Sequence, residues 1–320
     1  MFKKFLLLVV FILFALPQTF AADLLDFVPN DAGLVIRANI QQIVSIPEIK
    51  TKVQELINQQ GNDYIEQVKA TGFDPLTDIN SLVLFMPLEK IQRTNMANSN
   101  IAFAVDGKFD IDKTIESINS KKENASNILV STEDNFTTIT FVSDKGNSKM
   151  IFFDKNTVVV GTVIGVANAK AVKLGKIASI KNNKDFSNVI TNLNQNATLA
   201  LAATLPEELR QYIASNENAK PLSTIQYLSL DLTKTKDIDI NVNGYFAPKT
   251  DMEAVSKLLK QFGEVLNTTK APYGVLVDFA KNYKATSEGL TAKISSLVTQ
   301  ESIDKLIESK GHINKKEEKK

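Results

Sequence analysis

A gapless internal match constrains the fold of this chain more than any other feature of its sequence. The stretch DPLTDINSLVLF at residues 74–85 aligns on KPLSTIQYLSLD at residues 220–231, with the proline and the alternating apolar positions kept. Collinear self-similarity indicates a repeated structural unit. A single block could arise by chance, but three more follow in the same order, and together they predict an internal duplication: residues 31–40 match 196–205, 105–109 match 242–246, and 134–138 match 288–292.

Asp74 and Asp78 lie four residues apart in a loop-like stretch, which suggests a cation site or half of an acid pair. The second copy replaces them with Lys220 and Thr224. A calcium site needs about six to eight converging oxygens, far more than this pair supplies. The sequence therefore predicts a bend that leads into a strand, with dispensable exposed acids and a buried Leu84.

The pattern of elements predicts the α+β class: two related halves with antiparallel sheets and helices packed on one face. Short strand patterns are separated by Asp, Asn and Gly turns, which is typical of hairpins. A helical pattern covers residues 46–68, and capping-box sequences at Thr204 and Thr250 predict two helix starts. The expected division is a signal peptide at residues 1–21, a first α+β repeat at 22–180, a second at 181–310 and a charged, disordered tail at 311–320.

Residues 1–21 have the three parts of a secretory signal peptide. Lys3 and Lys4 form a positive start, an apolar stretch follows, and the small residues Thr19 and Ala21 predict cleavage after Ala21. The apolar stretch is shorter than the about 20 residues that cross a bilayer, so no stable membrane span is expected after cleavage. An uncleaved anchor is the alternative. The expected location is the periplasm or the cell exterior, where this cysteine-free chain must depend on its core rather than on disulfides.

The charge balance gives no electrostatic basis for binding nucleic acid. The chain has 37 basic and 36 acidic residues, and removing Lys3 and Lys4 leaves 35 against 36, a net charge of −1. The basic residues are scattered, and the dense run at residues 315–320 mixes lysine with glutamate. No nucleic-acid partner is therefore expected.

Two motifs resemble those of a known group of proteins. The segments LDFVPNDAGLV at residues 25–35 and GFDPLTDIN at residues 72–80 resemble exported bacterial proteins of unknown function, the DUF3352-like families. These open with LxxVPxDA and carry a GxDPLxDI turn. The resemblance covers roughly the first half of the chain, implies a periplasmic or surface location, and brings no catalytic residues with it.

The side-chain inventory argues against most catalytic chemistry. Without cysteine the chain has neither a thiol nucleophile nor a thiolate metal ligand. The only histidine, His312, lies beside the charged tail, so a Ser-His-Asp triad would depend on a terminal residue. Asp106, Asp110 and Asp112 cluster in DGKFDID, but the second copy reads NGYFAPK and keeps none of them. That loss favours a turn followed by a helix cap over a paired-acid site.

Two weaker signals remain. Gly161 and Gly165 lie where a strand passes into a helix, but their spacing is neither GxGxxG nor a P-loop, so a strand-to-helix turn is predicted. Tryptophan is absent, which leaves Tyr64, Tyr245 and Tyr273 as candidates for stacking on sugars. No catalytic, cofactor-binding or metal-ligating residue is predicted.

These features predict an exported, non-catalytic binding or scaffold protein of the bacterial envelope. Its unidentified envelope or extracellular partner would bind in a groove between the two related halves. Two alternatives stay open. A carboxylate-dependent hydrolase needs two acids about 5–10 Å apart in one cleft, and a carrier of an apolar ligand needs a continuous apolar cavity.

Overall fold

The computed structural model describes residues 23–59, 70–88, 99–120, 127–144, 146–268 and 274–305. The chain forms two compact units that divide between Asn188 and Val189, within helix α7 (Lys184–Thr191). The predicted division falls earlier, after residue 180. The predicted signal peptide, the cleavage site and the charged tail lie outside the described residues, as do Tyr64, Tyr273 and His312.

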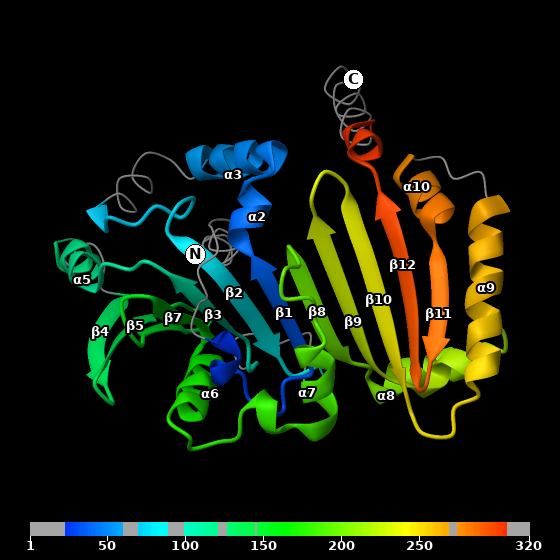
Figure 1. Ribbon diagram of the computed structural model, residues 1–320. Helices are drawn as coiled ribbons and strands as arrows, with labels where there is room; N and C mark the ends of the chain where they lie inside the picture. Colours follow the sequence, from blue (N-terminus) through cyan, green and yellow to red (C-terminus); the bar gives the residue numbers. More distant parts are fainter. Residues whose placement is uncertain are drawn as a thin grey trace. The chain divides into compact units, whose positions relative to one another are not determined.

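The sheet of the first unit has seven described strands in the spatial order β1-β2-β3-β7-β6-β5-β4, and all neighbours are antiparallel (Figure 1). Short turns join the consecutive strands β4, β5, β6 and β7, as the hairpin-like spacing predicts. Asp134 and Asn135 form the two-residue β4–β5 turn with positive φ angles of 51° and 70°, which such turns require. The strands are β1 (Leu34–Asn39), β2 (Ile79–Met86), β3 (Ala102–Gly107), β4 (Ile128–Glu133), β5 (Phe136–Phe141), β6 (Ser148–Phe152) and β7 (Thr157–Thr162).

Helix α6 (Val163–Lys173) and the 3₁₀ helix η1 (Leu24–Phe27) close one face of this sheet. Phe27 of η1 is buried against this face, as are Phe85 and Val159 of the strands. On the opposite face, Phe109 packs edge-on against Phe152 with ring centroids 6.1 Å apart. The remaining described helices of this unit are α2 (Ile40–Val44), α3 (Pro47–Gln59), α5 (Ile111–Asn119) and η4 (Ile180–Asn182).

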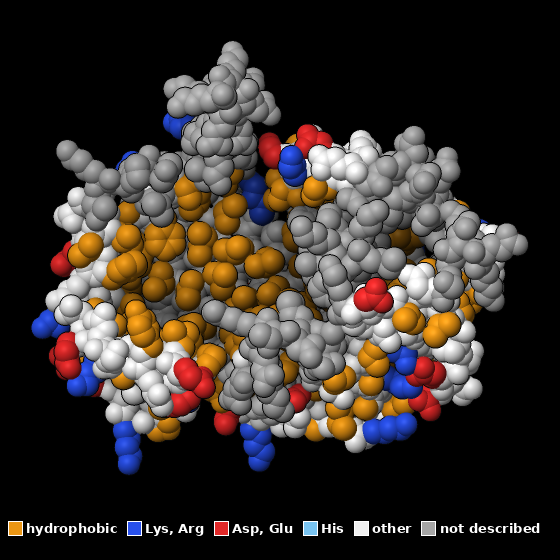
Figure 2. All heavy atoms as spheres, turned by 180° about the vertical axis from the view of Figure 1, so that it is seen from behind, with side chains coloured by type: hydrophobic (Ala, Val, Ile, Leu, Met, Phe, Trp, Pro, Cys, Tyr) orange, Lys and Arg blue, Asp and Glu red, His pale blue; other side chains and the backbone are white. Residues whose placement is uncertain are grey.

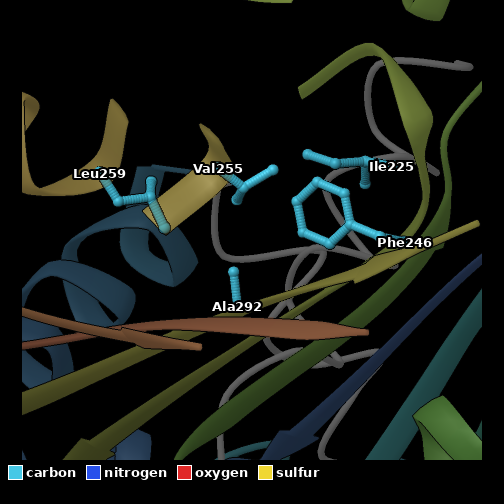
Figure 3. Packing of buried hydrophobic residues seen from close by; sticks show 5 residues of the cluster. All are labelled: Ile225, Phe246, Val255, Leu259 and Ala292. Atoms are coloured by element: carbon cyan, nitrogen blue, oxygen red, sulfur yellow. The ribbon is translucent and has the colours of Figure 1, made fainter. Parts of the chain in front are cut away.

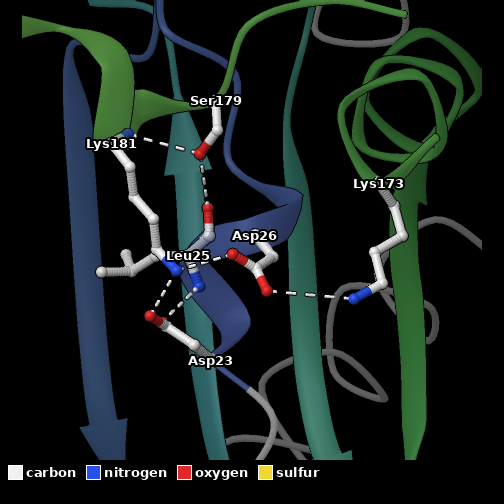
Figure 4. Close-up of polar contacts among 6 residues, drawn as sticks. All are labelled: Asp23, Leu25, Asp26, Lys173, Ser179 and Lys181. Carbon is white, nitrogen blue, oxygen red and sulfur yellow. Dashed lines mark hydrogen bonds and ion pairs between the residues drawn. The ribbon is translucent and has the colours of Figure 1, made fainter. Parts of the chain in front are cut away.

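Polar contacts fix η1 to a segment far along the chain (Figure 4). The Lys181 ammonium contacts the carboxylates of Asp23 at 2.5 Å and Asp26 at 2.6 Å, and the Ser179 hydroxyl donates to the Leu25 carbonyl at 3.1 Å. Buried side chains of η1 supply most of the stabilisation, because exposed ion pairs contribute at most about 1 kcal/mol each. The LxxVPxDA segment is therefore a structural element of the core.

The sheet of the second unit has five described strands in the order β11-β12-β10-β9-β8, all antiparallel. The strands are β8 (Leu199–Thr204), β9 (Ile225–Lys234), β10 (Ile238–Phe246), β11 (Lys284–Glu288) and β12 (Thr291–Val298). The helices are α8 (Glu207–Ala214), η5 (Lys220–Thr224), α9 (Met252–Thr268) and α10 (Gly274–Asn282), and residues 300–305 are also helical.

Helix α9 packs on one face of this sheet, as predicted. Val255 and Leu259 of the helix lie over Phe246 and Ala292 of the strands, with Ile225 beside them (Figure 3). The helix is held by Tyr283, whose hydroxyl donates to the Leu259 carbonyl at 2.8 Å.

The α+β class is confirmed, and several details differ from the prediction. Neither capping box forms: α8 begins after Pro206 without a side-chain cap, and Asp251 rather than Thr250 caps α9, accepting from the Ala254 amide at 3.0 Å. Helix α3 begins at Pro47, and the end of the predicted helix lies outside the described residues. Strand β11 and helix α10 were not predicted.

The two units share part of their strand register. In the first, Leu34 pairs with Met86, and the aligned residues Leu199 and Leu232 pair in the second. The pairing of the next two strands, β2 with β3 and β9 with β10, differs by two residues. Ile79 lies opposite Gly107, whereas the aligned Ile225 lies opposite Phe246, two residues beyond the aligned Gly244. The fourth matched block closes the outer β4–β5 hairpin in one unit and the β11–β12 hairpin next to β10 in the other. The duplication therefore stays a prediction.

Candidate binding surface

One face of the second unit's sheet is apolar across four strands. Residues paired across antiparallel strands point to the same face. Leu201 pairs with Leu230, Leu230 with Val242, and Val242 with Ile294, which makes one continuous aliphatic row. A second row runs from Leu199 through Leu232 to Ile240.

The described helices cover this face only in its part near β12. Near β12, Ala292 is buried under α9, and the buried Ser296 donates to the Phe279 carbonyl of α10 at 2.7 Å. Beyond the buried Ile225, the aliphatic residues on this face of β8, β9 and β10 are partly exposed, and Figure 2 shows hydrophobic side chains gathered over these strands. We call this set the apolar face: Leu199, Leu201, Ala203, Leu228, Leu230, Leu232, Ile238, Ile240 and Val242.

The chemistry of the apolar face is uniformly aliphatic. It contains neither an aromatic nor a charged side chain, and Lys234 stands at its edge, opposite Ile238. Soluble proteins rarely leave a continuous apolar patch in water unless it binds something. The apolar face is therefore the strongest candidate for a functional surface among the described residues.

The opposite face of the same strands is polar. The side chain of Asn243 donates to the Ser229 hydroxyl at 2.9 Å, and the Asn194 amide donates to the Asp231 carboxylate at 3.0 Å. Burial raises the pKa of Asp231 above its ordinary value. A hollow of about 440 Å³ lies on this face, lined by Asn194, Thr233, Asp239, Asn241, Asn282, Lys284, Ser295, Ser296 and Leu297. This hollow contains a single acid, so it lacks the acid pair that a glycoside hydrolase needs. Of the three tyrosines considered for stacking on sugars, Tyr245 lies in the described residues, and it pairs with Tyr227 of β9.

The aspartates of DGKFDID do not converge. Asp110 caps α5 by accepting from the Lys113 amide at 3.0 Å, which confirms the predicted helix cap. Asp106 lies on β3, is 4% exposed and accepts from the Asn80 amide group at 2.7 Å. Burial raises the pKa of Asp106, the hydrogen bond from Asn80 partly offsets this, and the nearby Asp154 charge raises it further.

The bend at residues 74–78 is confirmed, but its two aspartates accept hydrogen bonds within the turn. The Asp78 carboxylate accepts from the Asp74 amide at 2.7 Å, and the Asp74 carboxylate accepts from the Leu76 amide at 2.9 Å. Both carboxylates therefore serve the turn itself. The prediction for Leu84 is wrong, because Leu84 is half-exposed while Leu82 on the same face is fully buried.

The glycines after β7 serve close packing. Strand β7 runs directly into α6, which confirms the strand-to-helix turn, and the Thr162 hydroxyl caps the helix by accepting from the Gly165 amide at 3.0 Å. A β-carbon on Gly161 or Gly165 would lie 2.3 Å from the Ile101 carbonyl oxygen. These glycines let the Ile101 backbone approach, so a phosphate is not needed to explain them.

Within the described part of the chain, no cluster of three or more acidic, histidine or cysteine residues could hold a metal ion. The described helices also include none with the length and apolarity to cross a bilayer.

Comparisons with known proteins add no relative. No family model, curated protein or solved structure matches this chain. The resemblance to DUF3352-like families therefore stays a prediction.

Proposed function

We propose that this chain is an exported, non-catalytic binding protein of the bacterial envelope that holds the acyl chain of a lipid on its apolar face. The observation that carries the proposal is the continuous, partly exposed aliphatic surface of β8, β9 and β10. This surface lies within the second unit alone, so it does not depend on a groove between the halves.

The composition of the surface favours an acyl chain over a protein partner. Protein interfaces concentrate their binding energy in Trp, Tyr and Arg. The apolar face has none of these residues, and its Leu, Ile, Val and Ala side chains suit a ligand without polar groups. Burial of one leucine-sized side chain contributes about 1.5–3 kcal/mol, so a ligand that covers one row of this surface gains substantial affinity.

The location is part of the same proposal. Cleavage after Ala21 would leave η1, its capping residue Asp23 and the buried Leu24 in the mature chain. The LxxVPxDA-like segment supports the same location, since the families it resembles are exported.

The test measures binding of palmitate to the mature chain by isothermal titration calorimetry. Changing both Leu201 and Leu230 to glutamine should weaken binding by at least tenfold, because these paired side chains form half of one aliphatic row. The matched control is Asn241→Ser, on the opposite face of β10 next to Val242. Absence of palmitate and phospholipid binding by the unaltered chain would overturn the proposal.

A further inference from the structure

The outer strand of the first unit has backbone groups that point away from its sheet. β4 ends the strand order and pairs with β5, and Glu133 lies opposite Phe136 across a two-residue turn. At the other end, the Val142 amide donates to the Asn127 carbonyl at 2.8 Å. Antiparallel strands alternate between residues that bond to the partner and residues that point outward. The amides and carbonyls of Ile128, Val130 and Thr132 therefore face outward.

Among the described residues, this edge lacks the features that usually protect an edge strand against pairing. Natural edge strands are short, or carry lysine, proline or a bulge. β4 reads Ile-Leu-Val-Ser-Thr-Glu, its register with β5 is regular, and Leu129 is 55% exposed. The outer strand β11 of the second unit differs, because every residue except Ala285 is polar and it carries Lys284 and Glu288 at its ends.

The single charge on β4 does not block this edge. Lys149 and Lys170 contact the Glu133 carboxylate at 2.6 Å and 3.0 Å. Their hydrogen bonds hold the pKa of Glu133 below its ordinary value. The carboxylate is thus neutralised within its own unit.

We propose that β4 is a dimerisation strand, which pairs antiparallel with β4 of a second copy about a two-fold axis at Val130. Val130 then faces its own copy, and Ile128 faces Thr132. Each of these outward-facing pairs exchanges two backbone hydrogen bonds, about six in total.

The strand is self-complementary, which identifies a second copy as the partner. In this register Leu129 lies opposite Ser131, and Glu133 lies opposite Asn127, so no like charges meet. Leu129 also lies diagonally across from its own copy, within reach of a long side chain. The pairing therefore supplies an apolar neighbour for the exposed leucine.

The first experiment compares two proline variants of the full mature chain by analytical ultracentrifugation over a wide range of concentrations. Val130→Pro removes an outward amide and leaves the ladder to β5 intact, so it should yield a monomer with a nearly unchanged melting temperature. Ser287→Pro removes an outward amide from β11 and should stay dimeric. A monomeric unaltered chain, or a Val130→Pro variant that is folded and dimeric, would overturn the proposal.

A second experiment decides the matter if Val130→Pro fails to fold. The chain has no cysteine, so Val130→Cys introduces a single thiol. Directly paired residues have Cα atoms about 5.5 Å apart, within the range that a disulfide spans. Mild oxidation should crosslink Val130→Cys much faster than Ser287→Cys. Equal rates would overturn the proposal.

Discussion

Asn80 and Gln226 are each the extra residue of a β-bulge at the same place in their own sheets. Ile79 and Ser81 pair with Gly107 and Asp106, which leaves Asn80 without a partner on β3. Ile225 and Tyr227 pair with Phe246 and Tyr245, which leaves Gln226 without a partner on β10. A bulge bends its strand and redirects a side chain. In the first unit the redirected side chain is that of Asn80, which reaches the buried Asp106.

The buried Asp106 should make stability depend on pH. Its folded-state pKa is raised above the ordinary value of 3.8, chiefly by burial. The folded state therefore binds the carboxyl proton of Asp106 more tightly than the unfolded state does. The free energy of unfolding falls as pH rises from the unfolded-state pKa to the folded-state pKa of Asp106. Asp106→Asn keeps an acceptor for Asn80 and removes the buried charge. We expect a higher melting temperature than the unaltered chain at pH 8, with the gap closing as pH falls toward 4. A lower melting temperature at pH 8 would mean that the ionised carboxylate stabilises the fold.

The Ile101 carbonyl should make Gly165 intolerant of a side chain. A β-carbon there would lie 2.3 Å from that oxygen. Gly165→Ala should lower the free energy of unfolding by about 1–3 kcal/mol, the usual cost of overpacking. Gly175→Asn is the control, because Gly175 has a φ of 70° with open space around it, a conformation that Asn tolerates. If urea titrations show that both variants lose the same free energy of unfolding, close packing at Gly165 is contradicted.

The ion pairs of Glu133 should stabilise the first unit only above acid pH. Hydrogen bonds from Lys149 and Lys170 lower the pKa of Glu133 below its ordinary 4.5. Its contribution is thus present above pH 4.5 and lost as pH falls through the lowered pKa. Glu133→Gln should reduce stability by up to about 1 kcal/mol at pH 7, and this difference should shrink in thermal melts as pH falls below 4.5. Glu48→Gln, an exposed acid in the first turn of α3, should change little at either pH.

The bend before β2 should depend on Asp78. Replacing Asp78 with alanine leaves the Asp74 amide without its 2.7 Å acceptor, so we expect a loss of about 0.5–1.5 kcal/mol. Asp144→Ala, at an exposed turn position, should stay within about 0.5 kcal/mol. Chemical denaturation measures both, and an unchanged Asp78→Ala would return the acids to the dispensable role that the sequence predicts.

Two leucines of β2 should differ in their cost of truncation. Leu82 is fully buried and Leu84 half-exposed on the same face. Leu82→Ala should destabilise by about 2–5 kcal/mol, and Leu84→Ala should cost clearly less. Equal losses would show that Leu84 is covered in solution.

Sequence patterns predicted some elements to the residue and missed others for physical reasons. The apolar run before Gly161 predicted β7 correctly, because every residue of that strand except its last is buried. Strand β11 was missed because an edge strand needs no apolar alternation, and its sequence is Lys-Ala-Thr-Ser-Glu. The cap of α9 was misplaced because Asp251 competes with Thr250 for the same helix end.

The candidate surface could be predicted only in part. Leucine alternation in residues 225–234 predicts that one face of the strand is apolar. Alternation is the same whether helices cover that face or leave it in water. The decisive fact is that α9 and α10 pack near β11 and β12, which follows from tertiary packing rather than from any local pattern.

The contact between Asp26 and Lys181 has a consequence for how the chain matures during synthesis. The two residues are 155 positions apart in sequence, and chains emerge at about 5–20 residues per second. The beginning of the chain must therefore wait about 8–30 s before Lys181, which anchors it, has been synthesised. During that interval Leu24 and Phe27 have no complete core to enter, which makes the first segment of the folded body the one that most needs a chaperone.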